Sequence, residues 1–221
     1  MGLLRRASID PYPSSVKPLG RAGFWNSARP PGIVIGEMNT TNRLVSRMSV
    51  LAATGKKGLL PYVTAGFPDL ATTKRILQAI ADAGATAVEL GIPFSDPIAD
   101  GPVIQSSFTR ALDRGIRVQD ILAMVADFRR GCDMPILAML SYSIVYRIGV
   151  DKFLRMAADA GIDGLIVPDL SLEEASQTAR AVTDAGLCMP MLVSPVSSPD
   201  RRRRIASLSS SSTTFSAKST I

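Results

Sequence analysis

The chain has 221 residues, of which 46% are apolar and 20% charged, enough for one large globular domain but not for two comfortable ones. Histidine is absent and the two cysteines, Cys132 and Cys188, lie far apart, which argues against a structural zinc site, a disulfide framework and an imidazole base. No apolar run approaches the length of a membrane span. The net charge of +6 includes the four arginines of Arg201–Arg204, and because no aromatic residue is interleaved there, a solvated helix face is favoured over a nucleic-acid site.

Residues 1–37 differ in composition from the rest of the chain. Prolines are interleaved with Gly, Ser and Arg, and no helical or alternating apolar period survives. The segment is predicted to be an extended or disordered arm. Its arginines and serines faintly suggest a transit peptide, but the amphipathic period of such a peptide is missing. A translation start at Met38 is the preferred interpretation.

Folded elements are predicted from residue 40 onward. Apolar residues at three- and four-residue spacing predict a helix over residues 40–53, which Gly55 ends. A first strand over 58–66 is followed by a helix that starts at Pro68-Asp69 and runs to Ala83. Further helix starts are indicated by Pro102, by a capping box at Ser171–Glu174 and by Ser198-Pro199-Asp200.

The tripeptide Asp-Ala-Gly recurs at 82–84, 159–161 and 184–186, each time closing a helix before an apolar strand; Gly131 precedes a similar strand without the Asp-Ala. Strands that alternate with helices in this way predict an α/β fold with a parallel sheet. A closed β/α barrel has eight such units and ~250 residues. Residues 38–208 are therefore predicted to form a partial barrel of about five to six units. Strands are expected at Leu59, Ala87, Pro135, Gly164 and Met189, with a weak sixth at 212–216.

Beyond Ser207 the composition becomes a polar, Ser-rich tract that is unsuited to a core strand. Residues 209–221 are predicted to be a low-complexity tail. The chain is expected to be cut short, or read out of frame, near this point.

The stretch from Ala87 to Gln105 carries three carboxylates around the end of one predicted strand. Glu89 lies within the strand, and Asp96 and Asp100 lie in the loop that follows. Two carboxylates around an apolar pocket can move protons at different sites of one substrate. The alternatives are a buried ion pair for Glu89 and backbone capping for Asp96 and Asp100.

Residues 89–105, Glu-Leu-Gly-Ile-Pro-Phe-Ser-Asp-Pro-Ile-Ala-Asp-Gly-Pro-Val-Ile-Gln, closely resemble the signature of the tryptophan synthase α subunit family. Pro61–Gly66 with Pro68-Asp69 is similar to that family's first strand, and the likeness extends from about Thr41 to Leu208. It implies a (β/α)8 TIM-type barrel, incomplete here, and a cytoplasmic lyase of tryptophan biosynthesis. This lyase cleaves indole-3-glycerol phosphate by a retro-aldol reaction into indole and glyceraldehyde 3-phosphate.

The resemblance also implies roles for individual residues. Glu89 would shuttle protons to C3 of the indole and from the glycerol hydroxyl, and Asp100 would accept the indole N–H. Tyr62 and Ile104 match positions that line the apolar indole slot, with plain core packing as the alternative.

The same resemblance implies a partner. Indole passes to a tryptophan synthase β subunit, which carries pyridoxal phosphate in an α2β2-type complex, whereas the α subunit itself uses no cofactor. Asp96 and Pro97 match the part of the family's loop that touches the β subunit. Neither a metal, nor nucleic acid, nor a membrane is expected as a ligand.

Two departures from the family pattern stand out. Ser141-Tyr142 replaces a usual Tyr-Tyr pair, so that Ser141 takes the place of a tyrosine near the substrate, with Tyr142 as a compensating residue. The turns that bind phosphate after the family's later strands have no counterpart here. A weakly active or inactive, aggregation-prone chain is therefore expected. The alternatives are an inactive fragment that only docks on the β subunit and a different phosphate-handling barrel.

Overall fold

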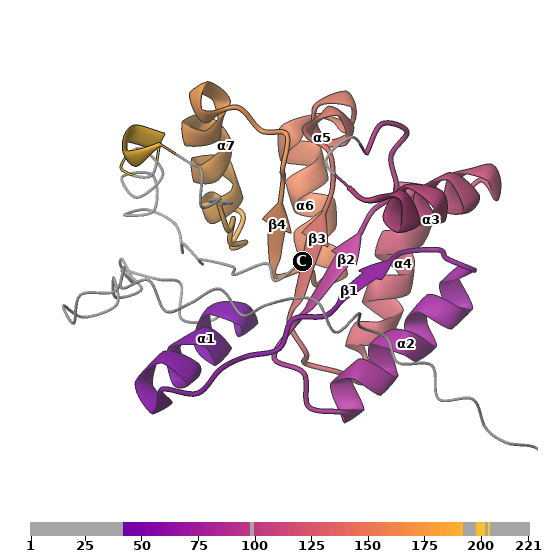
Figure 1. The fold of residues 1–221 in the computed structure, drawn as a ribbon, viewed down its shortest axis with the longest axis horizontal. Coiled ribbons are helices and arrows are strands. Elements are labelled where there is room, and N and C mark those ends of the chain that lie inside the picture. The colour runs from indigo at the N-terminus through magenta and orange to yellow at the C-terminus, as the bar shows by residue number, and fades with distance from the viewer. Residues whose placement is uncertain (1–41, 98–99, 192–197, 202, 204–221) are drawn as a thin grey trace, which may run out of the picture. The chain divides into compact units, whose positions relative to one another are not determined.

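The computed structural model describes residues 42–97, 100–191, 198–201 and 203, and these form an α/β fold around one parallel sheet (Figure 1). The strand order is β1-β2-β3-β4, so each strand lies beside the next along the chain. Tyr62 pairs with Glu89 and Glu89 with Leu137. The strands are β1 (Tyr62–Thr64), β2 (Val88–Gly91), β3 (Ile136–Met139) and β4 (Gly164–Ile166).

Helices connect successive strands, as parallel pairing requires. A single helix joins β1 to β2, whereas two helices lie between β2 and β3 and two more between β3 and β4. The helices are α1 (Arg43–Thr54), α2 (Leu70–Asp82), α3 (Pro102–Asp113), α4 (Val118–Arg129), α5 (Tyr142–Ile148), α6 (Val150–Ala160) and α7 (Leu172–Asp184).

Local signals place most helix ends where the sequence predicts them. The Asp69 side chain accepts a hydrogen bond from the Thr72 N–H at 2.6 Å, and Pro102 is the first residue of α3. The glycines of the three Asp-Ala-Gly segments have φ values of 78°, 87° and 77°, the left-handed conformation that ends a helix. Gly131 also follows a helix end as predicted, directly after Arg130, the C-cap of α4, although it is not among the described glycines with positive φ.

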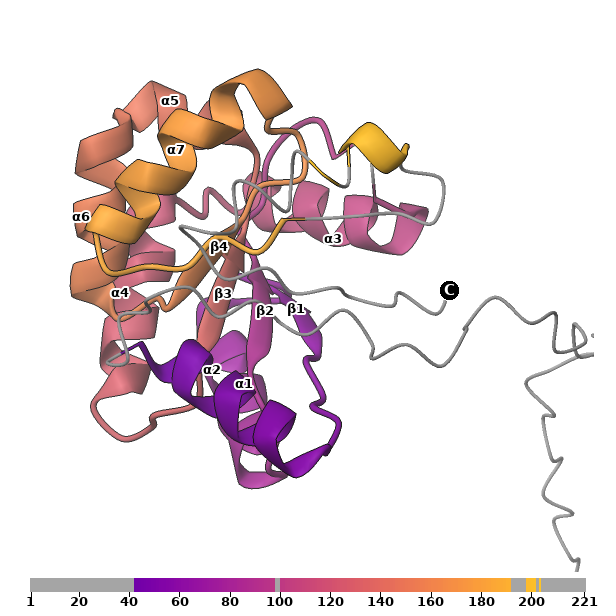
Figure 2. The same ribbon diagram turned by 90° about the vertical axis from the view of Figure 1, so that its left-hand side faces the viewer.

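The sheet buries both faces. The outer face, which includes Val88, Leu90 and Ile136, packs against α2, α4, α6 and α7. The inner face carries the alternate residues, among them Ala87 and Leu137. Helix α1 covers this face near the N-terminal ends of the strands with Leu44 and Val45. Figure 2 shows α1 at the N-terminal end of the strands and α3 at the opposite end. Because side chains alternate along a strand, Tyr62, Glu89 and Gly91 belong to the inner face.

The predicted fifth strand at Met189 is present only as a single bridge within the described residues. Cys188 pairs with Gly164, through a 2.8 Å bond from the Leu165 N–H to the Cys188 carbonyl. Gly164 permits this approach, because an added Cβ would lie 2.6 Å from that carbonyl oxygen. The sixth strand at 212–216, the arm at 1–37 and the tail at 209–221 lie outside the described residues.

An ion-pair cluster that the sequence analysis did not predict joins several elements at the N-terminal end of the sheet. Asp163, whose side chain is 3% exposed, lies 2.8 Å from Arg43 Nε and 2.6 Å from Arg129 Nη2. Its Oδ2 also accepts the Ile136 N–H at 2.8 Å. Burial raises the pKa of Asp163, and the neighbouring Arg129 opposes that rise. The cluster ties α1 and α4 to the starts of β3 and β4.

Candidate active site

Glu89 lies on the inner face of β2, at the same level as Tyr62 on the neighbouring strand. Its side chain is half-buried, and burial raises the pKa of its carboxyl group. Across the described part of the chain it makes no ion pair and no hydrogen bond through its side chain, so the alternative of a buried pair with Lys or Arg finds no support there. A half-buried carboxyl without a fixed partner is suited to exchanging protons.

Asp100 is held by its backbone at the start of α3. Its N–H donates to the Pro97 carbonyl at 3.0 Å, and its own carbonyl accepts from Gln105 Nε2 at 2.8 Å. Gly101 is the N-cap of α3 and no side chain caps that helix, so the carboxylate of Asp100 does not have the capping role considered as its alternative. Burial raises the pKa of Asp100 as well.

Tyr62 brings a hydroxyl group to the two carboxylates. Its ring lies over Gly91, where an added Cβ would come 2.6 Å from Cζ and closer still to the hydroxyl oxygen. Burial, with the nearby charges of Asp100 and Glu89, raises the pKa of Tyr62 to about 12. The sequence prediction treated Tyr62 as an apolar wall. The structure instead gives it a polar end at the C-terminal edge of β1 and β2.

Ile104 and the loop before α3 come next in the sequence to Glu89 and Asp100. Ile104 is half-buried on the first turn of α3. Asp96 is exposed and accepts a 2.7 Å hydrogen bond from Ser95 Oγ, while Pro97 is half-buried. The start of the loop is anchored by Phe94, which stacks edge-on against Phe108 at 5.3 Å between ring centroids. Asp96 is thus presented to solvent on the loop between Glu89 and Asp100.

Tyr142 is placed differently from the sequence prediction, and Ser141 before it is the N-cap of α5. Ser141 Oγ donates to Asp169 at 2.7 Å, and the Tyr142 N–H donates to the same carboxylate at 2.9 Å. The Tyr142 ring packs with the outer core and lies 6.4 Å from the Tyr146 ring. Because Tyr142 begins α5 and turns toward the helices, it does not compensate for the missing tyrosine on the inner face.

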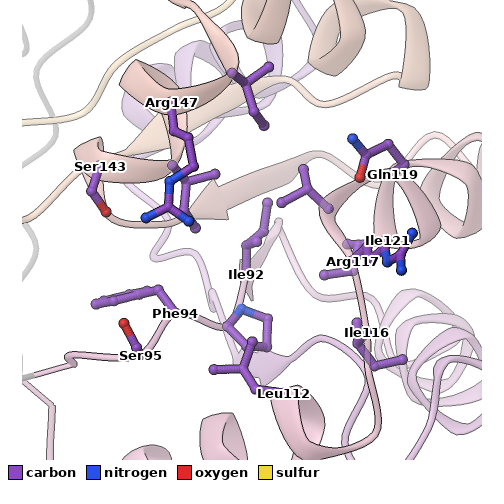
Figure 3. Close-up of a pocket in the computed structure, with 14 residues that line it drawn as sticks. Ile92, Phe94, Ser95, Leu112, Ile116, Arg117, Gln119, Ile121, Ser143 and Arg147 are labelled. Carbon is purple, nitrogen blue, oxygen red and sulfur yellow. The ribbon is translucent and has the colours of Figure 1, made fainter.

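A groove of about 370 Å³ opens beside the same loop, between β2, the start of α4 and α5 (Figure 3). Its floor is apolar and includes Ile92, and Arg117 and Arg147 lie on opposite sides of it. Glu89, Asp100 and Tyr62 do not line it. The groove is therefore a feature of the outer side of the sheet and is separate from the carboxylate pair.

Two polar residues next to Tyr62 were not singled out from the sequence. Thr64 Oγ1 donates to the Tyr62 hydroxyl at 3.5 Å and lies 2.7 Å from Ser107 Oγ. The alternation of β1 places Thr64 on the same face as Tyr62 and could have indicated it. Ser107 comes from α3, and no local signal connects it to β1.

Neither a metal nor a membrane feature is found in the ranges that the structure covers. No group of His, Cys, Asp and Glu side chains is arranged to hold a metal ion there, and none of the helices in those ranges is both long and apolar enough to span a bilayer.

Comparison with known proteins shows extensive similarity to one family. The sequence model described as "Tryptophan synthase alpha chain" matches residues 48–218. The tryptophan synthase alpha chain of Synechocystis sp. is 43% identical over 165 residues, and that of Thermosynechococcus vestitus is 42% identical over 167. These matches cover 75% and 76% of this chain, but 62% and 63% of the relatives, so the chain spans somewhat less than two thirds of their length.

Solved structures agree with the sequence relatives. The tryptophan synthase subunit alpha of Legionella pneumophila has a TM-score of 0.71 at 40% identity, with 74% of this chain and 63% of that chain covered. A structure of the tryptophan synthase complex from Pyrococcus furiosus gives 0.66 at 40% identity, with 68% and 62% covered. The neighbours are TIM barrels, of which the four-stranded sheet is a part. The chain therefore belongs to the tryptophan synthase alpha chain family, whose role lies in tryptophan biosynthesis.

Proposed function

We propose that the chain carries the proton-transfer groups of a lyase that cleaves indole-3-glycerol phosphate into indole and glyceraldehyde 3-phosphate. The observation that carries the proposal is that Glu89 lies level with Tyr62 in the sheet and that the charges of both Glu89 and Asp100 act on the Tyr62 hydroxyl. Both carboxyls have a raised pKa, and neither has a basic partner within the described ranges. In β/α barrels this edge is where catalytic groups lie.

Glu89 serves as the proton shuttle. In its protonated form it gives a proton to C3 of the indole ring, which leaves a positive charge at the ring nitrogen. The resulting carboxylate then takes the proton of the glycerol hydroxyl on the adjacent carbon. The carbon–carbon bond breaks, its electron pair returns to the ring, and the deprotonated oxygen becomes the aldehyde carbonyl. Burial supports this cycle, because a raised pKa increases the share of Glu89 that carries the proton it has to donate.

Asp100 stabilises the charged intermediate. As the indole nitrogen becomes positive, its N–H is a stronger donor, and an ionised carboxylate that accepts it lowers the energy of that state. The half-exposed position of Asp100 suits this role, since water access limits the cost of keeping its charge. Tyr62 and Ile104 supply the neighbouring walls of the slot.

The partner in this proposal is a tryptophan synthase β subunit. Asp96, exposed on the loop beside the carboxylate pair, and Pro97 next to it are the proposed contacts. Pyridoxal phosphate would be held only by the β subunit, and the proposed chemistry of this chain needs no cofactor. A cytoplasmic location is part of the same proposal.

Indole release from indole-3-glycerol phosphate tests the proposal, with Glu89→Gln and Asp100→Asn as the decisive variants. We expect weak turnover by the unaltered chain and a further loss of roughly 100-fold or more in Glu89→Gln, from the lower end of the range for removal of a general acid–base upward. An exposed carboxylate of the same loop, in Asp96→Asn, is the matched control and should keep its turnover. Equal turnover in Glu89→Gln and the unaltered chain would refute the mechanism.

A second candidate function is docking on a β subunit without catalysis. It is favoured by the coverage, because the match spans 62% of the length of the Synechocystis relative. Co-purification with a β subunit tests it. Docking that Asp96→Ala weakens, without indole release in any variant, would support this function over the lyase.

A further inference from the structure

Three hydroxyl groups form a chain that runs from α3 to β1 and ends near Glu89 and Asp100. It consists of Tyr62, Thr64 and Ser107, and we call it the hydroxyl chain. Thr64 Oγ1 lies 3.5 Å from the Tyr62 hydroxyl and 2.7 Å from Ser107 Oγ. Thr64 and Ser107 are only 8% and 7% exposed, so water has little access to this side of the Tyr62 hydroxyl.

The close approach of Gly91 constrains the Tyr62 hydroxyl from another side. Tyr62 begins level with Glu89 in the strand register, yet its hydroxyl reaches the level of Gly91, two residues nearer the C-terminal edge. Any side chain at position 91 would occupy the same space as the hydroxyl. The phenol is thus aligned along the strand toward its C-terminal edge, within reach of the charges of Glu89 and Asp100.

Proton counting indicates what the Tyr62 hydroxyl can do. Ser107 Oγ lies 2.7 Å from both Thr64 Oγ1 and the Ile104 carbonyl oxygen, and its single proton can serve either. When Ser107 donates to Thr64, Thr64 donates to the Tyr62 oxygen, and the phenol proton is left for a further acceptor. With a pKa of about 12, Tyr62 keeps that proton at neutral pH.

We propose that Thr64 and Ser107 are positioning residues that hold the Tyr62 hydroxyl as a hydrogen-bond donor to an oxygen of the substrate's glycerol chain. The inference rests on the proposed lyase function. Its acceptor follows from the chemistry of that substrate: the indole N–H can only donate, so the glycerol phosphate part supplies the acceptors. Tyr62 would then orient the carbon atom whose hydroxyl proton Glu89 removes.

A double-mutant cycle between Ser107→Ala and Tyr62→Phe tests the proposal. Each substitution removes one hydroxyl and little else, and indole release is measured for the four combinations. We expect Ser107→Ala to lower turnover roughly 2- to 10-fold, the range for one hydrogen bond, and to have no effect in the Tyr62→Phe background. Thr64→Val should reproduce the loss and Thr64→Ser should restore turnover, because serine keeps the hydroxyl. Ser106→Ala, an exposed neighbour on α3, is the control.

The unfolding equilibrium of the same four proteins separates this proposal from the lyase function. Coupling between positions 62 and 107 in that equilibrium supports the hydroxyl chain even if no variant releases indole, a result that would remove only the lyase function. An equal loss from Ser107→Ala in both backgrounds, in turnover and in unfolding, would overturn the proposal. So would unchanged turnover in Ser107→Ala when Glu89→Gln abolishes it.

Discussion

Replacement of Asp163 by asparagine is the most informative test of how this sheet is held together. The substitution keeps the size of the side chain and removes its charge. Asp163 is 3% exposed, and the guanidinium of Arg129, which it faces at 2.6 Å, is 10% exposed. In Asp163→Asn that guanidinium stays buried without a counter-ion, and the new amide presents N–H groups where the structure requires acceptors.

The expected cost follows from the surroundings of Arg129. Removal of one partner from a buried ion pair costs about 3–5 kcal/mol, because the other charge is left uncompensated. Arg129 also donates to the carbonyls of Gly161 and Cys132 at 2.7 and 3.1 Å, and Arg43 is 37% exposed, so both cations keep some solvation. We therefore expect Asp163→Asn to lower the free energy of unfolding by about 3 kcal/mol, the lower end of that range. For a chain of this size that is a fall in Tm of about 6–12 °C.

Urea unfolding followed by circular dichroism measures this cost, with Asp127→Asn as the matched control. Asp127 lies on the same helix as Arg129 and pairs with Lys74 and Arg130, but it is 35% exposed. Exposed pairs contribute about 0–1 kcal/mol, so Asp127→Asn should unfold close to the unaltered chain. Equal free energies of unfolding for the two variants would refute the assignment of Asp163 as the buried junction of the sheet.

Three further predictions concern the inner face and the edge of the sheet. Because burial raises the folded-state pKa of Glu89, its contribution to stability is present below the usual value of 4.5 and is lost as pH rises through the raised value. Glu89→Gln should therefore gain Tm relative to the unaltered chain between pH 4 and pH 7, and a constant difference would contradict this. Gly91→Ala should displace the Tyr62 ring and lower indole release at least as much as Tyr62→Phe, whereas turnover above that of Tyr62→Phe would argue against the close approach. Gly164→Ala should separate Cys188 from β4 and expose its buried thiol to a thiol reagent, and an unchanged labelling rate would show that the edge tolerates a Cβ.

Much of the architecture was predictable because its signals are local. The Asp69 cap, the proline that opens α3 and the repeated Asp-Ala-Gly segments act within one turn of a helix, and the helices start and end where these residues stand. The positions of the first four strands were predicted correctly for the same reason, although each is shorter than its apolar run. Gly131 likewise stands directly after the C-cap of α4, Arg130, but without the positive φ of the three repeated glycines.

The candidate site was predictable only in part. Glu89 and Asp100 stand in one continuous motif, so the sequence by itself could bring them together and indicate the family. The polar end of Tyr62, by contrast, depends on Gly91 of the adjacent strand and on Ser107 of α3. Asp163 likewise gains its partners from α1 and α4, which are distant along the chain. The sequence determined the elements, the order of the strands and the carboxylates, because these depend on neighbouring residues. Tertiary packing decided which groups are buried and paired, because a side chain's solvation depends on every element that surrounds it.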